Sequence, residues 1–549
     1  MTFGALAGPA SALPVPANPV LRAGRTLVGR DIPRLDIPSK VDGSAVFGAD
    51  VRLPGMVYAA IRQSPVFRAR LVSVDAAAIA GRRGVIEVVK LADAVAVVAD
   101  SYWRAQAAVD ALHIRFASPP QARYTTAGIA ESHRLQLESP TAVTAIRSGD
   151  AEAVMDGAEV SSADYRVPYL YHATMETMTC TVSISDGSCE YWVPTQWMSA
   201  VAELGARLTG LPPAKVAVHA TLLGGGFGRK FELDYVEQAT LIAKVVKRPV
   251  QLIWSRPENV QHGFYRPMTT ARVRGVLKDG TLEAMSIRVV SASIAEFRAQ
   301  GIPFTGGYDP RAVLGLSTET SQAPGKLQQY AVEHFTAEAV YQPAHVPCGS
   351  WRSVGASENG FFVESFIDEL AHKAGQDPYE FRRRLLRSSA RGLATLDRAA
   401  AEAKWTEPAP AGRHRGIALS ECVGSMVAQV VEVSVAGGDV TVHRVWCAID
   451  CGTAVSPDGA RAQVMGAIVM GLSTALHEEI TIEAGRCAQS GFSDYRVLSM
   501  AETPEIHVFI VESGYPIGGV AEAGVCRPRR PRCATPSSGQ LASASGACL

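Results

Sequence analysis

The sequence predicts an α+β protein of several domains, and three observations support this prediction. The chain has 549 residues, which at ~100–200 residues per domain indicates two to four domains. Hydrophobic residues make up 47% and charged residues 19%, a globular balance with ample material for cores. Short β-rich runs and amphipathic helical patterns occur together along the chain, which favours mixed layers of helix and sheet.

Charge and hydropathy exclude two classes of partner. Lys+Arg and Asp+Glu are equal at 53 each, so nothing in the net charge points to nucleic acid or to an anionic membrane. No run approaches the ~18 apolar residues that a membrane span needs, and the longest candidate, Gly466–Leu476, is shorter. The first 20 residues lack the basic start of a secretory signal, so the compartment stays open, with cytoplasmic as the default.

The first 120 residues predict a linker and then a small α+β unit. Residues 1–30 are interrupted by several prolines and are interpreted as a linker. From Val46 to Ile61, strand-like runs surround the Pro54–Gly55 turn, and residues 84–98 contain two β-rich segments. A helical spacing of apolar residues follows from Trp103 to Leu112.

A larger mixed region is expected over residues 150–390, and its last part is helical. Apolar residues between Phe362 and Ala371 fall on one face of an amphipathic helix that Gly375 ends. Asp377 and Glu380 predict a capping box that opens the next helix, with a proline at its first position.

A third region is expected over residues 410–525. It contains strand-like runs at Ala428–Val435 and Val440–Ile449 and then a small-residue helix at Ala462–Leu476. Residues 526–549 have four arginines, three cysteines, no acidic residue and little periodicity. We interpret them as an aberrant tail produced by a shift of reading frame, which reading the coding DNA in the other two frames would test.

The glycine-rich segment Leu222–Arg229 is the first candidate for chemistry. An alternating strand-like run, Lys215–Leu223, leads into it, and a helix is expected over Asp234–Val246. Three consecutive glycines, Gly224, Gly225 and Gly226, let backbone N–H groups approach an anionic ligand closely near a helix N-terminus. The segment matches neither a phosphate-binding P-loop nor a dinucleotide-binding fingerprint. A plain strand-to-helix turn is the alternative.

Two further segments have residue types suited to a site. In Pro347–Gly355, Arg352 offers a planar fork for phosphate, carboxylate or an oxo group, with a structural ion pair as the alternative. In Pro516–Gly524, Glu522 stands alone among small residues. In an apolar cleft its pKa would rise, which would suit a general base, and a solvent-facing carboxylate is the alternative.

No protein metal site is expected. The nearest cysteine pair, Cys447 and Cys451, lacks the second pair that a zinc site would need, so ordinary buried thiols are the favoured interpretation. The sequence also shows no site for an iron–sulfur cluster.

Taken in order, several segments resemble the molybdopterin-binding large subunits of the xanthine oxidase family, over roughly residues 31–525. Residues 31–120 resemble the α/β hammerhead domain of aldehyde oxidases and xanthine dehydrogenases, 150–390 the first and 410–525 the second molybdopterin-binding region. The fold implied is therefore a hammerhead domain followed by two mixed α/β regions. The segments that carry the resemblance are Lys40–Ala45, Leu53–Met56, Ala99–Ala105, His172–Glu176, Pro194–Gln196, Gly224–Gly228, Trp351–Gly355, Phe362–Leu370, Asp450–Gly452, Gln463 and Gly466.

Trp351–Gly355 and Phe362–Leu370 have the form typical of the isoquinoline 1-oxidoreductase beta-subunit branch. The resemblance implies hydroxylation of an electron-poor carbon in an N-heterocycle or an aldehyde, with oxygen derived from water. It implies molybdopterin, in the cytosine dinucleotide form, as cofactor, and a separate small subunit with 2Fe–2S clusters as partner. A cytochrome c is an open option as electron acceptor.

The resemblance also implies residue roles. Glu522 matches the catalytic base, Arg352 helps to orient substrate or to stabilise developing charge, and Gln196 lies beside the molybdenum. The residues expected to bind the cofactor are Gly224, Gly225, Gly226, Phe227, Gly228, Gln196, Arg352 and Gln463.

Some features depart from the family's pattern. A Gly-Gln-Gly segment and its domain, usual at the start of the family, have no match here, and the usual segment after Gly524 is missing. The chain is thus expected to be truncated at both ends, and a twin-Arg signal for the periplasm could lie in the missing part. Thr177 replaces the usual proline after Glu176, and Ala521 and Ala523 flank the expected base.

These departures leave two alternatives open. One is an inactive truncated homologue, or the product of a broken gene, that binds no molybdenum cofactor. The other is supply of the missing N-terminal domain by a neighbouring gene.

Overall fold

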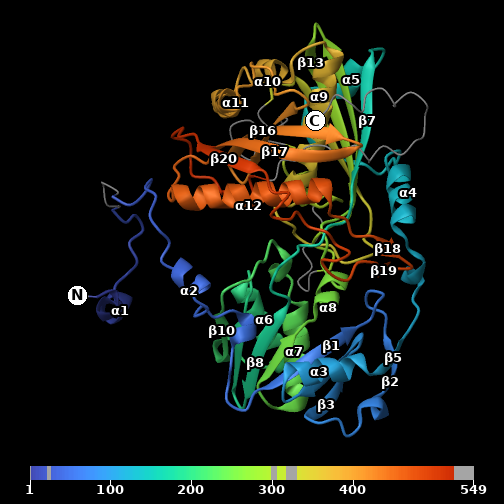
Figure 1. Cartoon of the computed structure of the whole chain (residues 1–549), viewed down its shortest axis with the longest axis vertical. Helices are drawn as coiled ribbons and strands as arrows, with labels where there is room; N and C mark the ends of the chain where they lie inside the picture. Colours follow the sequence, from blue (N-terminus) through green and yellow to red (C-terminus); the bar gives the residue numbers. More distant parts are fainter. Residues whose placement is uncertain (1, 21–25, 298–305, 317–329, 525–549) are drawn as a thin grey trace.

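The computed structural model of the chain describes residues 2–20, 26–297, 306–316 and 330–524. Figure 1 shows two lobes: a lower one around strands β1 and β8, and an upper one that contains β13, β16 and α9, with α12 along the side that faces the lower lobe. The candidate site lies where segments from both lobes meet.

The lower lobe is built on a seven-stranded sheet with the order β10-β9-β8-β11-β1-β4-β3. Its strands are β1 Val57–Gln63, β3 Val85–Lys90, β4 Ala94–Ala99, β8 Thr179–Ser185, β9 Ser188–Val193, β10 Val216–Ala220 and β11 Val250–Ile253. The helices of this lobe are α3 Tyr102–Asp110, α6 Met198–Thr209, α7 Asp234–Val246 and α8 Arg256–Gln261, and β2 Leu71–Asp75 pairs with β5 His113–Phe116 beside them. Strand β1 pairs in parallel with β11, so segments distant in sequence share one sheet and one core.

The upper lobe contains a five-stranded sheet and a four-stranded sheet with the orders β6-β14-β13-β12-β7 and β15-β16-β17-β20. The first comprises β6 Val143–Ser148, β7 Val160–Val167, β12 Thr269–Lys278, β13 Thr281–Ser291 and β14 His334–Tyr341, and the second β15 His414–Cys422, β16 Ser425–Ala436, β17 Asp439–Asp450 and β20 Glu505–Ile510. The helices are α4 Thr126–Gln136, α5 Ala151–Met155, α9 Ala356–Lys373, α10 Pro378–Leu385, α11 Ala390–Glu402 and α12 Pro457–Leu476. The short strands β18 Ile482–Glu483 and β19 Arg486–Cys487 form a separate pair.

Helix α9 joins the two upper sheets into one core. Its apolar face, predicted from the spacing between Phe362 and Ala371, is buried, and it packs against strands of both sheets. The helix stops where predicted, since Gly375 adopts φ +63° just beyond it. Because the turn Trp351–Gly355 immediately precedes α9, this buried helix fixes where the turn lies.

Most elements predicted in the sequence are present, including the mixed fold class, and some boundaries differ. Asp377 caps α10 by accepting the amides of Tyr379 and Glu380, which is the first half of the predicted capping box. Helix α12 begins at Pro457, five residues before the predicted start, because a proline suits a first helical turn. The predicted linker contains an exposed helix, α1 Phe3–Ser11, and then α2 Ile37–Val41 follows.

One predicted strand is wrong, and the difference matters for the site. The run that starts at Val46 forms no strand with its neighbours and instead makes a single bridge from Phe47 to Leu222. It then enters a short 3₁₀ turn at Gly48–Asp50. This segment therefore lies along the entrance to the glycine loop. The predicted aberrant tail, residues 526–549, lies outside the described residues.

Candidate cofactor-binding site

The glycine loop Gly224–Gly228 connects β10 to the single 3₁₀ turn Arg229–Phe231, which precedes α7. Its first amide donates to Glu176 Oε2 at 3.0 Å, and its last amide donates to Gln196 Oε1 at 3.1 Å. The three amides between them, Gly225 to Phe227, donate to no group in the described part of the chain. Gly226 is buried, and buried backbone donors almost always have a partner, so its unpaired N–H and the two beside it mark a candidate ligand site.

Gln196, predicted to lie beside the cofactor, lies directly on this loop. A Cβ built on Gly226 would lie 2.5 Å from Gln196 Oε1, so a larger residue here would force the Gln196 side chain to move. The backbone of Gln196 donates to Lys230 O at 3.0 Å, which fixes it to the far end of the loop. The side chain of Gln196 is exposed, so its amide group is accessible from the cleft side of the loop.

Arg352 is buried, and main-chain oxygens hold much of its guanidinium group. Its Nε donates to Ala521 O at 2.6 Å and its Nη2 to Gln463 O at 2.9 Å. Burial lowers the pKa of Arg352, and the neighbouring carboxylate of Glu522 opposes that shift. Through these hydrogen bonds Arg352 joins three segments: its own turn, helix α12 and the loop that carries Glu522.

Glu522 is half-buried and is held by the turn that carries Arg352. Its Oε2 accepts the backbone N–H of Ser353 at 2.5 Å, and its main-chain oxygen accepts the Ser353 hydroxyl. Ala521, which flanks Glu522, is not among the described residues with positive φ, so it adds no left-handed strain to this loop. The neighbouring Gly524 packs so closely on Ala467 of α12 that a Cβ there would lie 2.6 Å from it.

Gln463 lies on the same side of α12. Besides its main-chain contact, its Oε1 accepts from Arg352 Nη2 at 3.4 Å. Gly466, one turn further along, also lies beside Arg352, since a Cβ there would be in van der Waals contact with Nη1 at 3.6 Å. The exposed middle of α12 therefore lies beside the turn that carries Arg352.

The glycine loop and the segment that carries Arg352 meet at Ser350. Gly228 has φ +104°, and a Cβ on it would lie 1.6 Å from Ser350 O. The same oxygen is 2.9 Å from Nε2 of the buried His172. Burial lowers the pKa of His172 to about 3, so the ring is neutral and donates through Nε2. The structure thus brings the glycine loop into contact with the segment that carries Arg352, which in turn contacts Glu522.

Backbone strain concentrates at this junction. Four residues with side chains adopt left-handed φ here: Ala173 (+52°), Phe227 (+52°), Ser353 (+74°) and Val354 (+49°). Such conformations cost of order 1–3 kcal/mol each and cluster at functional sites. The ring of Phe227 is 38% exposed, so it is accessible on the outer surface of the loop.

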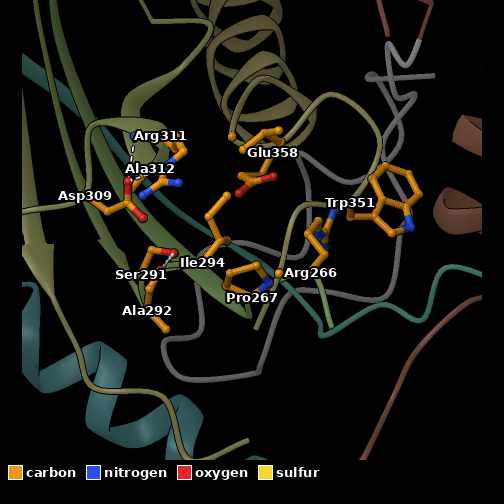
Figure 2. Close-up of a pocket in the computed structure, with 13 residues that line it drawn as sticks. Arg266, Pro267, Ser291, Ala292, Ile294, Asp309, Arg311, Ala312, Trp351 and Glu358 are labelled. Atoms are coloured by element: carbon orange, nitrogen blue, oxygen red, sulfur yellow. Dashed lines mark hydrogen bonds and ion pairs between the residues drawn. The ribbon is translucent and has the colours of Figure 1, made fainter. Parts of the chain in front are cut away.

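Figure 2 shows a small pocket whose lining includes Trp351, Arg266, Glu358 and Asp309. Its volume is about 10 Å³, at most room for a single water molecule. Arg266 is buried, donates through Nη2 to Pro168 O at 2.7 Å, and leaves Nε and Nη1 without a partner in the described residues. Its guanidinium carbon lies 5.8 Å from the Trp351 ring centroid, so a buried cation supports the turn from behind.

The sequence did not predict four contributors to the site: Glu176, Lys230, His172 and Arg266. Glu176 and His172 lie within a segment that carries the family resemblance, which gave no role to either. Lys230 and Arg266 have no local signal, because each acts through partners far away in sequence.

The cysteine pair is ordinary. Cys447 and Cys451 are buried free thiols, and burial raises the pKa of Cys451. No cluster of His, Cys, Asp and Glu in the described residues could hold a metal ion. Among the same residues, no helix is both long and apolar enough to cross a bilayer.

The fold and the cradle of unpaired amides define a cofactor-binding subunit, and comparison with known proteins gives its family. Two family profiles described as "Molybdopterin cofactor-binding domain" match residues 135–386 and 356–504. The chain belongs to the molybdopterin-binding large subunits of the xanthine oxidase family, as the sequence predicted.

Within that family, the chain is similar to "Isoquinoline 1-oxidoreductase subunit beta" of Brevundimonas diminuta, with 31% identity over 92% of the chain and 66% of the relative. It is also similar to "Membrane-bound aldehyde dehydrogenase [pyrroloquinoline-quinone]" of Gluconacetobacter polyoxogenes, with 27% identity over 91% of the chain and 69% of the relative. The chain therefore spans about two thirds of the length of these relatives.

A solved structure shares the fold. Quinoline 2-oxidoreductase from Pseudomonas putida 86 superposes with a TM-score of 0.74 at 15% identity, over 92% of this chain and 94% of that one.

Proposed function

We propose that this chain is the large subunit of a molybdenum hydroxylase that oxidises an N-heterocycle or an aldehyde with oxygen derived from water. Electrons then pass to a small subunit with 2Fe–2S clusters. The observation that carries the proposal is the row of amides from Gly225 to Phe227, unpaired within the described residues, next to the turn that carries Arg352 and contacts Glu522.

The donors at the site fit a molybdopterin. Backbone N–H groups, the side-chain amide of Gln196 and the cation of Arg352 suit the anionic groups of such a cofactor. When bound, the cofactor supplies the two-electron redox chemistry, and we propose the cytosine dinucleotide form.

Glu522 is the proposed general base. The Ser353 amide fixes one carboxylate oxygen, Oε2, which leaves the other oxygen to accept a proton. Arg352, bonded to the main chain of Ala521 beside Glu522 and of Gln463 in α12, keeps positive charge beside the carboxylate. This charge would stabilise negative charge that develops on the substrate.

The substrate class follows from the names of the relatives and from the exposed ring of Phe227. Isoquinoline and quinoline are planar N-heterocycles, and the second relative is named for an aldehyde. A partly exposed aromatic ring on the loop suits a planar substrate, because such rings stack with an offset. A cytochrome c as a further electron acceptor remains part of the proposal.

Metal analysis of the purified chain, co-expressed with its candidate small subunit, tests the proposal. We expect about one molybdenum per chain and dye-coupled oxidation of an N-heterocycle or an aldehyde. Negligible molybdenum would establish the alternative, an inactive homologue that binds no cofactor. Co-expression with the upstream open reading frame shows whether a separate polypeptide completes the subunit.

Glu522→Gln tests the base. Glutamine keeps an oxygen that can accept the Ser353 amide, so molybdenum content should stay unchanged while turnover falls by about 10²–10⁴-fold. The matched control is Glu512→Gln, an exposed glutamate ten residues earlier in the chain, which should retain turnover. Full turnover in Glu522→Gln would refute the assignment.

A further inference from the structure

The carboxylate of Glu176 lies under the glycine loop, and three donors occupy it. Its Oε1 accepts the Gly48 amide at 2.8 Å. Its Oε2 accepts the Gly224 amide at 3.0 Å and the ammonium group of Lys230 at 2.5 Å. The side chains of Glu176 and Lys230 are 11% and 0% exposed, so this is a buried ion pair with both carboxylate oxygens bonded.

Glu176 also binds the loop through its backbone. Its N–H donates to Gly224 O at 2.9 Å, while the Gly224 amide returns a bond to its side chain. A Cβ on Gly224 would lie 2.4 Å from Glu176 Cβ. The start of the loop is therefore fixed in both directions, at a separation that only glycine permits.

The far end of the loop is fixed through Lys230. This residue lies in the 3₁₀ turn that follows the loop, and its carbonyl accepts the Gln196 amide at 3.0 Å. Gln196 in turn accepts the Gly228 amide. One carboxylate thus holds Gly224 directly and Gly228 through two intermediates, and the unpaired amides lie between these two points.

We propose that Glu176 is a positioning residue that sets the direction of the Gly225–Phe227 amides toward the cofactor. The inference rests on the proposed function for its ligand, but the contacts that it concerns lie within the chain itself. Glu176 is not a catalytic residue, because each of its oxygens is already bonded to the protein.

Lys230 has a second effect in this arrangement. A lone buried carboxylate beneath the amides would repel an anionic pterin, and the ammonium group neutralises it. Burial lowers the pKa of Lys230, and contact with Glu176 opposes that shift. The pair therefore supplies acceptors for the loop without adding net charge under it.

Glu176 also joins the loop to the N-terminal part of the chain. Gly48 follows the segment that bridges to Leu222, and a Cβ on Gly48 would lie 3.0 Å from Glu176 Oε1. The N-terminal segment that contains Gly48 is thereby fixed to the start of the glycine loop at the same carboxylate. This places one acidic residue at the junction of three segments distant in sequence.

The test measures residue-resolved hydrogen exchange of the amides of Gly224, Gly228 and Arg229, which are hydrogen-bonded in the loop. The test variant is Glu176→Gln combined with Lys230→Met, which avoids an unpaired buried charge. The control is Glu190→Gln, which removes a partly exposed carboxylate that contacts His219 on the same sheet. Each purified chain is also analysed for molybdenum.

If Glu176 positions the whole loop, all three amides should exchange at least about tenfold faster in the double variant, because lost buried hydrogen bonds free the segment. The control should match the parent chain. Faster exchange at Gly224 alone would overturn the proposal, because it would show a local contact without an effect along the loop. Unchanged exchange at all three would overturn it as well.

The molybdenum measurement separates this inference from the proposed function. We expect the double variant to retain less than about one tenth of the parent's molybdenum, since the donors no longer converge. A parent chain without molybdenum would refute the proposed function, yet the exchange data would still decide the positioning role. If the double variant keeps the parent's molybdenum content although its loop amides exchange faster, the link between the loop and the cofactor is overturned.

Discussion

In the glycine loop two of the three residues at positive φ are glycines, Gly225 and Gly228, and the third is Phe227, whereas in the Arg352 turn both such residues, Ser353 and Val354, have side chains. Glycine adopts positive φ without a steric penalty, but a serine and a β-branched valine do not. The loop lies on a saturated ion pair, while the turn lies beside a small pocket whose lining includes the partly unpartnered Arg266. Both the glycine loop and the Arg352 turn present polar groups to the candidate cofactor-binding site.

The difference shows two ways of fixing a backbone at a site. The loop depends on close approach, because Gly224 and Gly228 lie so near Glu176 Cβ and Ser350 O that a side chain does not fit. The turn depends on bonds that offset its strain, chiefly those from Arg352 and Ser353 to the loop that carries Glu522. A larger side chain should therefore disrupt the glycine loop, and a substitution that relieves backbone strain should alter the Arg352 turn.

Gly228→Ala should have the largest effect on this comparison. The new Cβ would lie 1.6 Å from Ser350 O, a backbone atom that cannot rotate away, so the glycine loop and the segment that carries Arg352 must separate. We expect a loss of about 3 kcal/mol or more in the free energy of unfolding and a loss of most of the bound molybdenum. Denaturant unfolding and metal analysis measure the two effects.

The matched control is Gly187→Ala in the turn between β8 and β9. Gly187 has φ +94°, close to that of Gly228, but a Cβ there meets nothing within 4 Å. The cost should be only the left-handed conformation, about 1 kcal/mol. If Gly228→Ala is no worse than Gly187→Ala, contact with Ser350 does not determine the site.

The contact between the glycine loop and the segment that carries Arg352 should also respond to pH through His172. Burial lowers its pKa to about 3, whereas the unfolded chain protonates near 6.5. The unfolded state therefore binds more protons between these values, so stability falls as the pH drops from 6.5 toward 3. Each such histidine contributes up to about 1.4 kcal/mol per pH unit.

His172→Gln removes this titration and keeps an N–H donor for Ser350 O. Between pH 5.5 and 4, at about 1.4 kcal/mol per unit, we expect a flatter slope of unfolding free energy with retained molybdenum. His133→Gln is the control, because burial lowers the pKa of His133 to about 4 in helix α4, outside the site. An unchanged slope in His172→Gln would mean that His172 is already charged in the folded chain.

The sequence predicted the elements of this site better than their contacts. Helix α9 and the strands β16 and β17 follow from local periodicity, which burial of one face enforces. Residue type singled out Arg352 and Glu522, the resemblance added Gln196, and the structure places all three around the glycine loop and Ser350. Their roles stay proposals.

Contacts between distant segments could not be predicted in this way. The ion pair of Glu176 with Lys230 spans 54 residues, and the bond from His172 to Ser350 spans 178. No local pattern specifies such pairs, because only the completed fold brings them together. Left-handed φ at Val354 and Val423 was equally hidden, since β-branched residues disfavour it.

The smallest effect is expected at Val423, where backbone strain can be tested at the tip of the β15–β16 hairpin of the upper lobe. Its carbonyl accepts the Gly519 amide of the loop that leads to Glu522, and its side chain is 49% exposed. Val423 and Gly424 have φ of +51° and +72°, matching Asp279 and Gly280 (+50° and +70°) in the β12–β13 hairpin. Asp-Gly and Asn-Gly suit such turns, and Val-Gly does not.

Val423→Asn should therefore raise the free energy of unfolding by about 1 kcal/mol, because asparagine tolerates the left-handed region. Ala484→Asn, at φ +49° in the β18–β19 turn, makes the same change away from the glutamate loop. Turnover should fall only in Val423→Asn if strain at this tip helps to hold Glu522, a trade of stability for activity. If Val423→Asn does not raise the free energy of unfolding, residues with side chains at positive φ store no strain here. The contrast between the glycine loop and the Arg352 turn would then fail.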